Sequence, residues 1–253
     1  MRPLLLHMHV PRSSGSSLHA WFVAALGTAG VAQASSPDEV AAVTSGGAAP
    51  AVVSGHYLHG VHARLTGRDH RYVVLLRDPV ERVLSLFRYI RGLPGHSRHA
   101  DLVRPGMTIP RYYAEGIPGS WARNGMVGQL AGSYSALPPE ERLARATEHL
   151  LDERTIFGLV EDPQPLLRSA AEILGLAEVP PLARVNRSAR MEPGQAFGGD
   201  AADLAAIVEH NRLDIELYRR AQVHLAERDR SAAPPPVPGL TERVLRRTLG
   251  WFR

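Results

Sequence analysis

Residues 4–18 read LLLHMHVPRSSGSSL, and the interpretation of the rest of the chain starts from this stretch. An apolar run ends at Pro11 and is followed by small hydroxyl residues, one Gly and an amphipathic segment. This order predicts a buried strand over residues 3–9, a tight loop, and a helix over 16–27. The backbone N–H groups at the start of such a helix favour a bound anion, and Arg12 adds a positive charge. The first hypothesis is therefore a phosphate-binding loop.

The composition limits the classes of protein to consider. With 253 residues and a hydrophobic content of 44%, the chain is long enough for one large α/β domain. Apolar runs stay well short of about 18 residues, so we expect no membrane span, and we expect the first ten residues to belong to the fold rather than to a signal peptide. The sequence contains no Cys, which excludes disulfides and thiolate metal sites and favours a cytoplasmic location. The net charge of +4, without a dense basic run, suits an anionic small ligand better than a nucleic acid.

A second strand–helix unit follows further along the chain. Residues 71–76 read RYVVLL and form the clearest predicted strand, because they are β-branched and apolar at their centre. A helix is predicted to begin directly afterwards. Asp78 is a favourable N-cap, Pro79 suits the first helical position, and Glu81 completes a capping-box pattern.

This unit offers the chemistry of a second phosphate site. Arg77 stands at the predicted strand end and Ser85 lies two turns into the helix, and an Arg fork with a hydroxyl group suits phosphate. The alternative is a capped helix with an exposed Arg82 and no ligand. A ligand with two separate phosphate groups would account for both stretches.

The remaining elements predict one α/β domain with a parallel sheet of about four or five strands and helices on both faces. Residues 28–50 are expected to be mostly irregular, and residues 92–118 are expected to be an irregular excursion or short helices. Because ligands bind at the carboxyl ends of parallel strands, the loop at 10–17, Gly55-His56 and Arg77 are expected to cluster. Further predicted strands are 31–34, 51–54 and 155–160, and further predicted helices are 57–65, 120–130, 139–151, 163–174 and 203–227.

The predicted domain covers residues 1–230. Residues 231–239 read SAAPPPVPG and are expected to form an extended linker. Residues 240–253 form a basic amphipathic segment, predicted to be a C-terminal helix. Its apolar side suits docking on its own domain or on another subunit, and contact with a membrane surface stays open as an alternative.

Taken together, the motifs resemble those of the sulfotransferases that use 3′-phosphoadenosine 5′-phosphosulfate (PAPS). The similarity is to the carbohydrate-type branch that includes heparan sulfate 2-O-sulfotransferase, in a bacterial member. That branch carries H-I-P-K-T-G-G-T-S, matched here by HVPRSSGSS at residues 9–17, and R-D-P-[VI]-E-R-x-x-S-x-[FY], matched by RDPVERVLSLF at 77–87. A G-H element between them is matched by Gly55-His56. The similarity spans about residues 4–220 and is patchy from 92 to 153.

The resemblance implies a P-loop-like sulfotransferase fold and transfer of a sulfuryl group from PAPS to a hydroxyl of a carbohydrate or small-molecule acceptor, without a metal. It implies that His56 is the general base and that Arg12 neutralises the leaving group. It further implies that the donor nucleotide is bound by Arg12, Ser13, Ser14, Gly15, Ser16 and Ser17 at the phosphosulfate, by Arg77 and Ser85 at the 3′-phosphate, and by Asn186 and Ser188 near the adenosine.

Two departures from the family pattern keep other functions open. Arg12 stands where the family has Lys, in a chain whose 29 Lys and Arg residues are all Arg, and Ser14 replaces the first Gly. If these changes are disabling, the chain is a nucleotide-binding pseudoenzyme. A small-molecule phosphotransferase with a degenerate P-loop is the other enzyme reading, although no G-x-x-x-x-G-K-[ST] motif is present.

The sequence does not identify the acceptor. Residues 92–135 are expected to shape its pocket. Within them, Arg123-Asn124 faces either the acceptor or the nucleotide, or is simply a polar helix surface.

Overall fold

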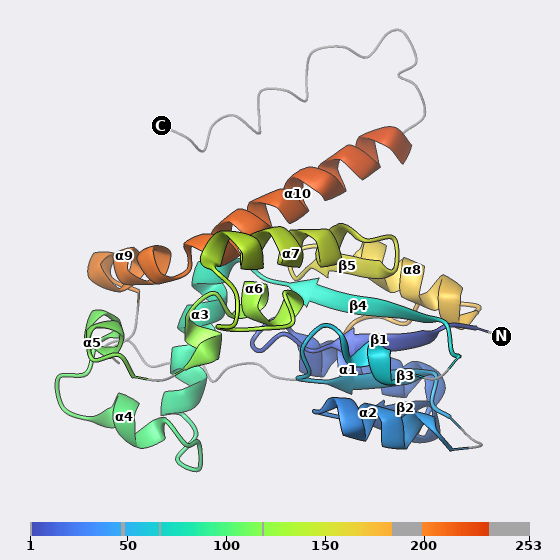
Figure 1. Cartoon of the computed structure of the whole chain (residues 1–253), viewed down its shortest axis with the longest axis horizontal. Helices are drawn as coiled ribbons and strands as arrows, with labels where there is room; N and C mark the ends of the chain where they lie inside the picture. The colour runs from blue at the N-terminus through green and yellow to red at the C-terminus, as the bar shows by residue number, and fades with distance from the viewer. Residues whose placement is uncertain (1, 47–48, 66, 118, 184–198, 233–253) are drawn as a thin grey trace, which may run out of the picture.

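A computed structural model describes the chain except for residues 1, 47–48, 66, 118, 184–198 and 233–253. Five parallel strands form one sheet with helices on both faces (Figure 1), as the sequence predicts. The strands are β1 (Leu4–Met8), β2 (Val31–Gln33), β3 (Val52–Gly55), β4 (His70–Leu76) and β5 (Thr155–Leu159). The helices are α1 (Gly15–Leu26), α2 (Pro37–Thr44), α3 (Pro79–Arg91), α4 (His99–Val103), α5 (Ile109–Ala114), α6 (Gly125–Leu130), α7 (Pro139–Leu151), α8 (Gln164–Leu174), α9 (Ala201–His210) and α10 (Arg212–Ala232).

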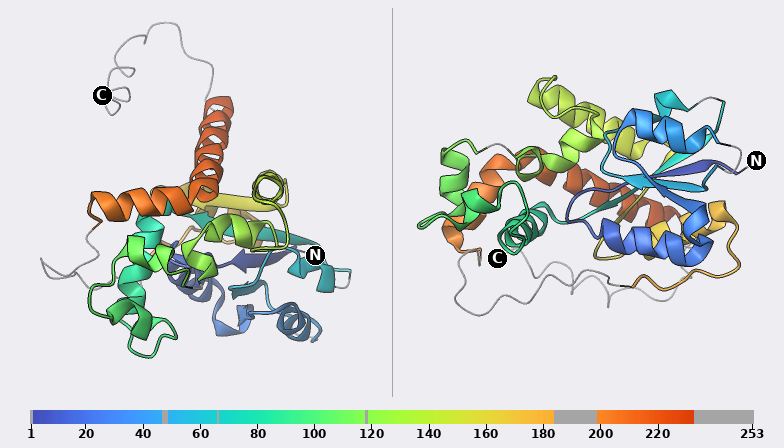
Figure 2. Two further views of the ribbon diagram at one scale, coloured as in Figure 1. Left: turned by 60° about the vertical axis from the view of Figure 1, so that its left-hand side comes forward. Right: turned by 90° about the horizontal axis from the view of Figure 1, so that it is seen from below.

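The sheet has the order β2-β3-β1-β4-β5, so β1 lies at its centre. Successive side chains of a strand point to opposite faces. Leu4, Leu6 and Met8 therefore pack in a core with α2, α6, α7 and α10, whereas Leu5 packs on the other face with α1 and α8. The right-hand view of Figure 2 shows α1 and α2 on opposite sides of the sheet.

A second group of helices lies beyond the carboxyl ends of the strands. Helices α3, α4, α5 and α9 share a separate hydrophobic cluster that includes Phe87, Leu102, Tyr112 and Ile207. Figure 1 shows these helices together at one end of the molecule. Helix α3 starts directly after β4, so it connects this group to the edge of the sheet where ligands bind in parallel α/β folds.

Two predicted helices are each interrupted by an asparagine. The helix predicted over 203–227 is two helices, α9 and α10, that separate at Asn211, and the helix predicted over 120–130 is a 3₁₀ turn (Ser120–Ala122) followed by α6. Asn211 Oδ1 accepts a hydrogen bond from the Asn124 backbone N–H, and Asn124 Oδ1 accepts from the N–H groups of Leu213 and Asp214. These side chains satisfy the backbone groups that each interruption frees.

Arg82 is not exposed. Its side chain is fully buried and pairs at 3.1 Å with Asp214, which is also fully buried. Asp214 also accepts hydrogen bonds from the N–H groups of Met126 and Val127, at the start of α6. The pair therefore ties α3, α6 and α10 together.

Two further local predictions are wrong. Residues 57–65 are not a helix, because Gly60 adopts φ 104° and its N–H donates to the Tyr72 hydroxyl; only a 3₁₀ turn (Val61–Arg64) follows. Residues 28–50, predicted to be mostly irregular, contain α2. The Ser36 side chain caps this helix by accepting from the Glu39 N–H, with Pro37 in its first turn.

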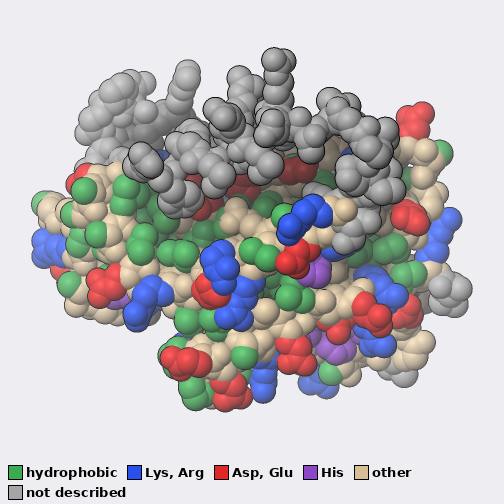
Figure 3. Space-filling model, turned by 90° about the horizontal axis from the view of Figure 1, so that it is seen from above, with side chains coloured by type: hydrophobic (Ala, Val, Ile, Leu, Met, Phe, Trp, Pro, Cys, Tyr) green, Lys and Arg blue, Asp and Glu red, His purple; other side chains and the backbone are tan. Residues whose placement is uncertain are grey.

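Basic and acidic side chains are interspersed over the face drawn in Figure 3. Within the described ranges, the helices lack the combination of length and apolar character that crossing a bilayer requires. In the same part of the chain, no group of three or more His, Asp or Glu residues is arranged to hold a metal ion.

Candidate functional site

A cavity of about 90 Å³ lies at the carboxyl edge of the sheet, between the loop after β1 and helix α3. The two stretches that the sequence marks as phosphate-binding therefore meet in space. Ser13 does not line the cavity. It is buried beneath the loop, and its hydroxyl has no hydrogen-bond partner among the described residues. The lining residues are His9, Arg12, Ser14, Gly15, Ser16, Ser17, Arg77 and Ser85.

The loop reaches this position through a strained backbone. Arg12 and Ser14 have φ values of 67° and 58°, in the left-handed region that costs an L-residue roughly 1–2 kcal/mol. Gly15 is required for space, since a Cβ atom there would lie 1.8 Å from Cδ2 of His9. The turn places the first N–H groups of α1, which have no intrahelical acceptor, at the cavity.

Two guanidinium groups approach this cavity. Arg12 Nε donates to the Ser85 hydroxyl at 3.1 Å, and its guanidinium lies 4.7 Å from the centre of the Tyr89 ring. Arg77 donates to the backbone oxygen of Arg12 at 3.3 Å and pairs with Glu81 at 3.4 Å. Burial lowers the pKa of Arg12, and the charge of Arg77 lowers it further. The described residues that line the cavity include no carboxylate, so its field favours an anion.

His56 lies beside this cavity on the segment after β3. Its Nδ1 lies 2.8 Å from the backbone oxygen of His9. Because a carbonyl oxygen only accepts, Nδ1 carries the proton, and Nε2 of the neutral ring keeps its lone pair. Desolvation lowers the pKa of His56 from 6.5, which favours that neutral form at neutral pH. The imidazole can therefore accept a proton.

Two aromatic contacts set the position of the His56 ring. The ring stacks on His9, with centroids 4.2 Å apart, and lies 5.4 Å from the ring of Trp121. His9 itself lines the cavity, so the His56 ring contacts a lining residue without lining the cavity itself. Trp121 comes from the 92–135 segment predicted to shape the acceptor pocket.

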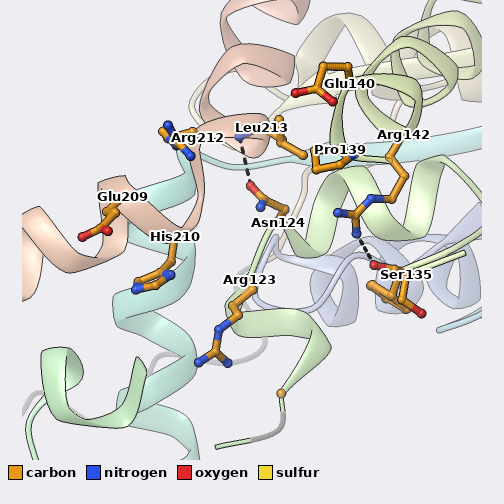
Figure 4. Close-up of a pocket in the computed structure, with 12 residues that line it drawn as sticks. Arg123, Asn124, Ser135, Pro139, Glu140, Arg142, Glu209, His210, Arg212 and Leu213 are labelled. Carbon is orange, nitrogen blue, oxygen red and sulfur yellow. Dashed lines mark hydrogen bonds between the residues drawn. The ribbon is translucent and has the colours of Figure 1, made fainter. Parts of the chain in front are cut away.

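Arg123 and Asn124 do not reach the small cavity. Arg123 donates to the backbone oxygens of Ile117 and Tyr113, and Asn124 binds the start of α10. Both residues line a larger cavity of about 790 Å³ (Figure 4), where the hydrogen bond from Leu213 to Asn124 is drawn. The side chain of Arg123 therefore connects its segment to α5, and the side chain of Asn124 connects the start of α6 to α10.

Some expected residues lie outside the described part of the chain. Asn186 and Ser188 fall within 184–198, and the predicted C-terminal helix at 240–253 falls within 233–253. Residues 233–239 of the predicted linker do so as well.

Tyr89 and Gln129 contact the site although the sequence analysis gave them no role there. Tyr89 follows Ser85 by four residues on α3, so the helical repeat was a signal that both face Arg12. Gln129 Nε2 donates to the backbone oxygens of His9 and Tyr57. Nothing in the local pattern of α6 signals this contact with β1.

Comparison with known proteins yields a likeness in structure but none in sequence. No protein-family model matches the chain, and no curated protein matches it. Among solved structures, the fold is similar to the mouse sulfotransferase SULT7A1 complexed with PAP, with a TM-score of 0.42 and 15% sequence identity. The match covers 70% of this chain and 59% of the mouse chain, so this chain spans less than two thirds of that protein's length.

Proposed function

We propose that the chain is a sulfotransferase that moves a sulfuryl group from PAPS to a hydroxyl of a carbohydrate or small-molecule acceptor. The observation that carries the proposal is the meeting of the α1 loop with Arg77 and Ser85 in one cavity, with the neutral-form imidazole of His56 beside it. Either half alone would suit many anions. The combination suits a donor with two phosphate-bearing ends and a reaction that needs a base.

The residues fit the charged parts of such a donor. A volume of about 90 Å³ is far below the roughly 300–1,000 Å³ of sites that enclose a whole small ligand, so the cavity encloses only the phosphate-bearing part of such a donor and not its nucleoside. The buried Ser13 hydroxyl, which has no partner among the described residues, is a further polar group at this loop. Ser85 accepts from Arg12, and among the described residues its own O–H has no recorded acceptor, so it can donate to a phosphate oxygen.

Each residue then has a defined part in the reaction. The acceptor oxygen attacks the sulfur atom as its proton passes to Nε2 of His56. The bond between sulfur and the bridging oxygen breaks, and Arg12 neutralises the charge that develops on the departing phosphate. The N–H groups of α1 and the hydroxyls of Ser14, Ser16 and Ser17 hold the phosphosulfate, while Arg77 and Ser85 hold the 3′-phosphate.

Calorimetric titration with adenosine 3′,5′-bisphosphate (PAP), the product, tests this assignment. We expect a dissociation constant of roughly micromolar or lower without Mg²⁺, and much weaker binding of ATP. Equal or tighter binding of ATP would contradict the proposal and favour a phosphotransferase.

The variant Arg77→Ala localises the site. It should weaken PAP binding by roughly tenfold or more, because it removes a charge-assisted contact to phosphate. Arg71→Ala is the matched control, since Arg71 lies near the other end of the same strand and pairs with Asp69. An equal loss of PAP affinity in both variants would show that the effect is general electrostatics.

A further inference from the structure

We propose that Gln129 is a positioning residue for His56, because it holds in place the backbone oxygen that accepts from the protonated nitrogen of the imidazole. The proposal rests on the proposed role of His56 as general base. Gln129 lies on α6 and is not itself among the residues that line the cavity, and the structure records no contact between its side chain and the His56 ring. It acts through the backbone of His9 and of Tyr57.

The shared oxygen belongs to His9. It accepts from His56 Nδ1 at 2.8 Å and from Gln129 Nε2 at 3.2 Å. A carbonyl oxygen has two lone pairs, so these two donors fill its capacity. Gln129 thereby fixes the direction from which the His9 oxygen accepts a hydrogen bond from His56.

Gln129 also binds the segment that carries His56. Its Nε2 donates to the Tyr57 oxygen at 3.0 Å, and its backbone oxygen accepts from the His59 N–H at 2.9 Å. The Tyr57 hydroxyl in turn donates to the Val53 oxygen at 2.8 Å. The residues that follow His56 are therefore attached to α6 at two points and to β3 at a third.

The burial of Gln129 makes these contacts rigid. Its side chain is fully buried, and its Oε1 has no hydrogen-bond partner in the described part of the chain. A buried amide donor without a hydrogen-bond acceptor is costly. Here both N–H groups of Nε2 donate, one to the oxygen that His56 also binds and one to the residue after His56. The assignment of Nε2 follows from its two carbonyl partners, because the opposite orientation would place oxygen against oxygen.

The position of α6 is itself fixed from the nucleotide side of the site. Asp214 accepts from the first turn of α6 and pairs with Arg82 of α3, one turn before Ser85. Hydrogen bonds and one ion pair thus connect the helix that carries Ser85, the helix that carries Gln129, and His56. In this series of contacts, Gln129 is the side chain that shares an acceptor with the imidazole.

The test measures the His56 ring directly by ¹⁵N NMR of the full chain, with the signal assigned by loss in His56→Asn. In the wild type we expect the neutral ring to carry its proton on Nδ1. In Gln129→Met, which keeps the side-chain length but cannot donate, we expect the Nδ1-protonated fraction to fall by roughly half or more and turnover to fall roughly tenfold. PAP affinity should change by less than about twofold, because the cavity lining is intact.

Two further variants keep the test decisive. Val127→Ala removes core packing from the same helix, and it should lower stability while leaving the His56 tautomer unchanged. If Gln129→Met does not fold, Gln129→Leu serves in its place, since its side chain also cannot donate and should cause the same loss. A wild-type tautomer in either folded Gln129 variant, or an equal tautomer shift in Val127→Ala, would overturn the proposal. The NMR result does not require sulfuryl transfer, so it stands or falls separately from the proposed function.

Discussion

Two groups of histidines lie at different ends of the central strands. His9 and His56 stack at the carboxyl end of the sheet, beside the small cavity. The second group, His59, His62, His70 and His149, surrounds Tyr72 near the start of β4. Its closest rings, those of His59 and His149, have centroids only 3.7 Å apart.

The two groups bind Nδ1 in similar ways and differ in what lies beside the rings. In the first, Nδ1 of His56 is held by a backbone oxygen, and Nε2 is left for chemistry. In the second group, Nδ1 also lies next to a protein oxygen: His62 Nδ1 lies 2.9 Å from the Tyr72 hydroxyl, and His149 Nδ1 lies 2.7 Å from the Leu130 oxygen. The same residue type thus serves as a candidate base beside the small cavity and as stacked rings next to Tyr72 in the other group. The place of the ring relative to the cavity, and not the frequency of histidine, makes the difference.

The variant His56→Ala should distinguish the roles of the two groups most clearly. We expect turnover to fall by about 10²–10⁴-fold, because the acceptor proton loses its base, while PAP affinity stays the same. The measurement is sulfuryl transfer from labelled PAPS alongside PAP calorimetry. His59→Phe is the matched control from the other group and should retain turnover. Full activity of His56→Ala would remove His56 from the mechanism.

The second group should appear instead in the pH dependence of stability. Burial, together with the nearby His149 and His62, lowers the pKa of His59 to about 3. Above about pH 6.5 the ring is neutral in both the folded and the unfolded states. Below that pH only the unfolded chain takes up the proton, so His59 lowers the free energy of unfolding by up to about 1.4 kcal/mol per pH unit towards pH 3.

The variant His59→Phe isolates this contribution, because it keeps an aromatic ring that cannot titrate. Urea unfolding at pH 8 and pH 5 should show a smaller loss of stability for the variant than for the wild type. An equal loss in both proteins would place the acid sensitivity elsewhere.

The smallest effect concerns the loop that lines the small cavity beside the first group. Ser14→Gly should stabilise the fold by about 0.5–1 kcal/mol, because Gly adopts a φ of 58° without strain but gains freedom in the unfolded chain. Ser16→Gly, in the first turn of α1, should instead destabilise it. Urea unfolding of both variants decides the matter, and a loss of stability in Ser14→Gly would contradict the strain at this position.

The sequence predicted the parts of the site that depend on local patterns. Arg12 and Arg77 each follow an apolar run, and parallel strands bring such positions to one edge of a sheet. The helix after Asp78 was predicted for the same reason, since its capping pattern lies within a few residues.

What the sequence did not predict depends on distant partners. Arg82 is buried because Asp214 lies against it, although 132 residues separate them in the chain. The interruptions at Asn124 and Asn211 follow from hydrogen bonds that each makes to the other's neighbourhood. Helical periodicity alone cannot reveal such reciprocal contacts.

The central place of β1 has a consequence for how the site comes into being during folding. His9, His56 and Arg77 follow β1, β3 and β4, which are neighbours in the sheet although they lie up to about 70 residues apart in sequence. Pairing of distant strands is the slow step in folding, because the chain between them loses entropy before contacts form. The anion cavity therefore cannot form from any short fragment. Nucleotide affinity during refolding would report the pairing of the three central strands, while fraying of the edge strand β2 would leave it unaffected.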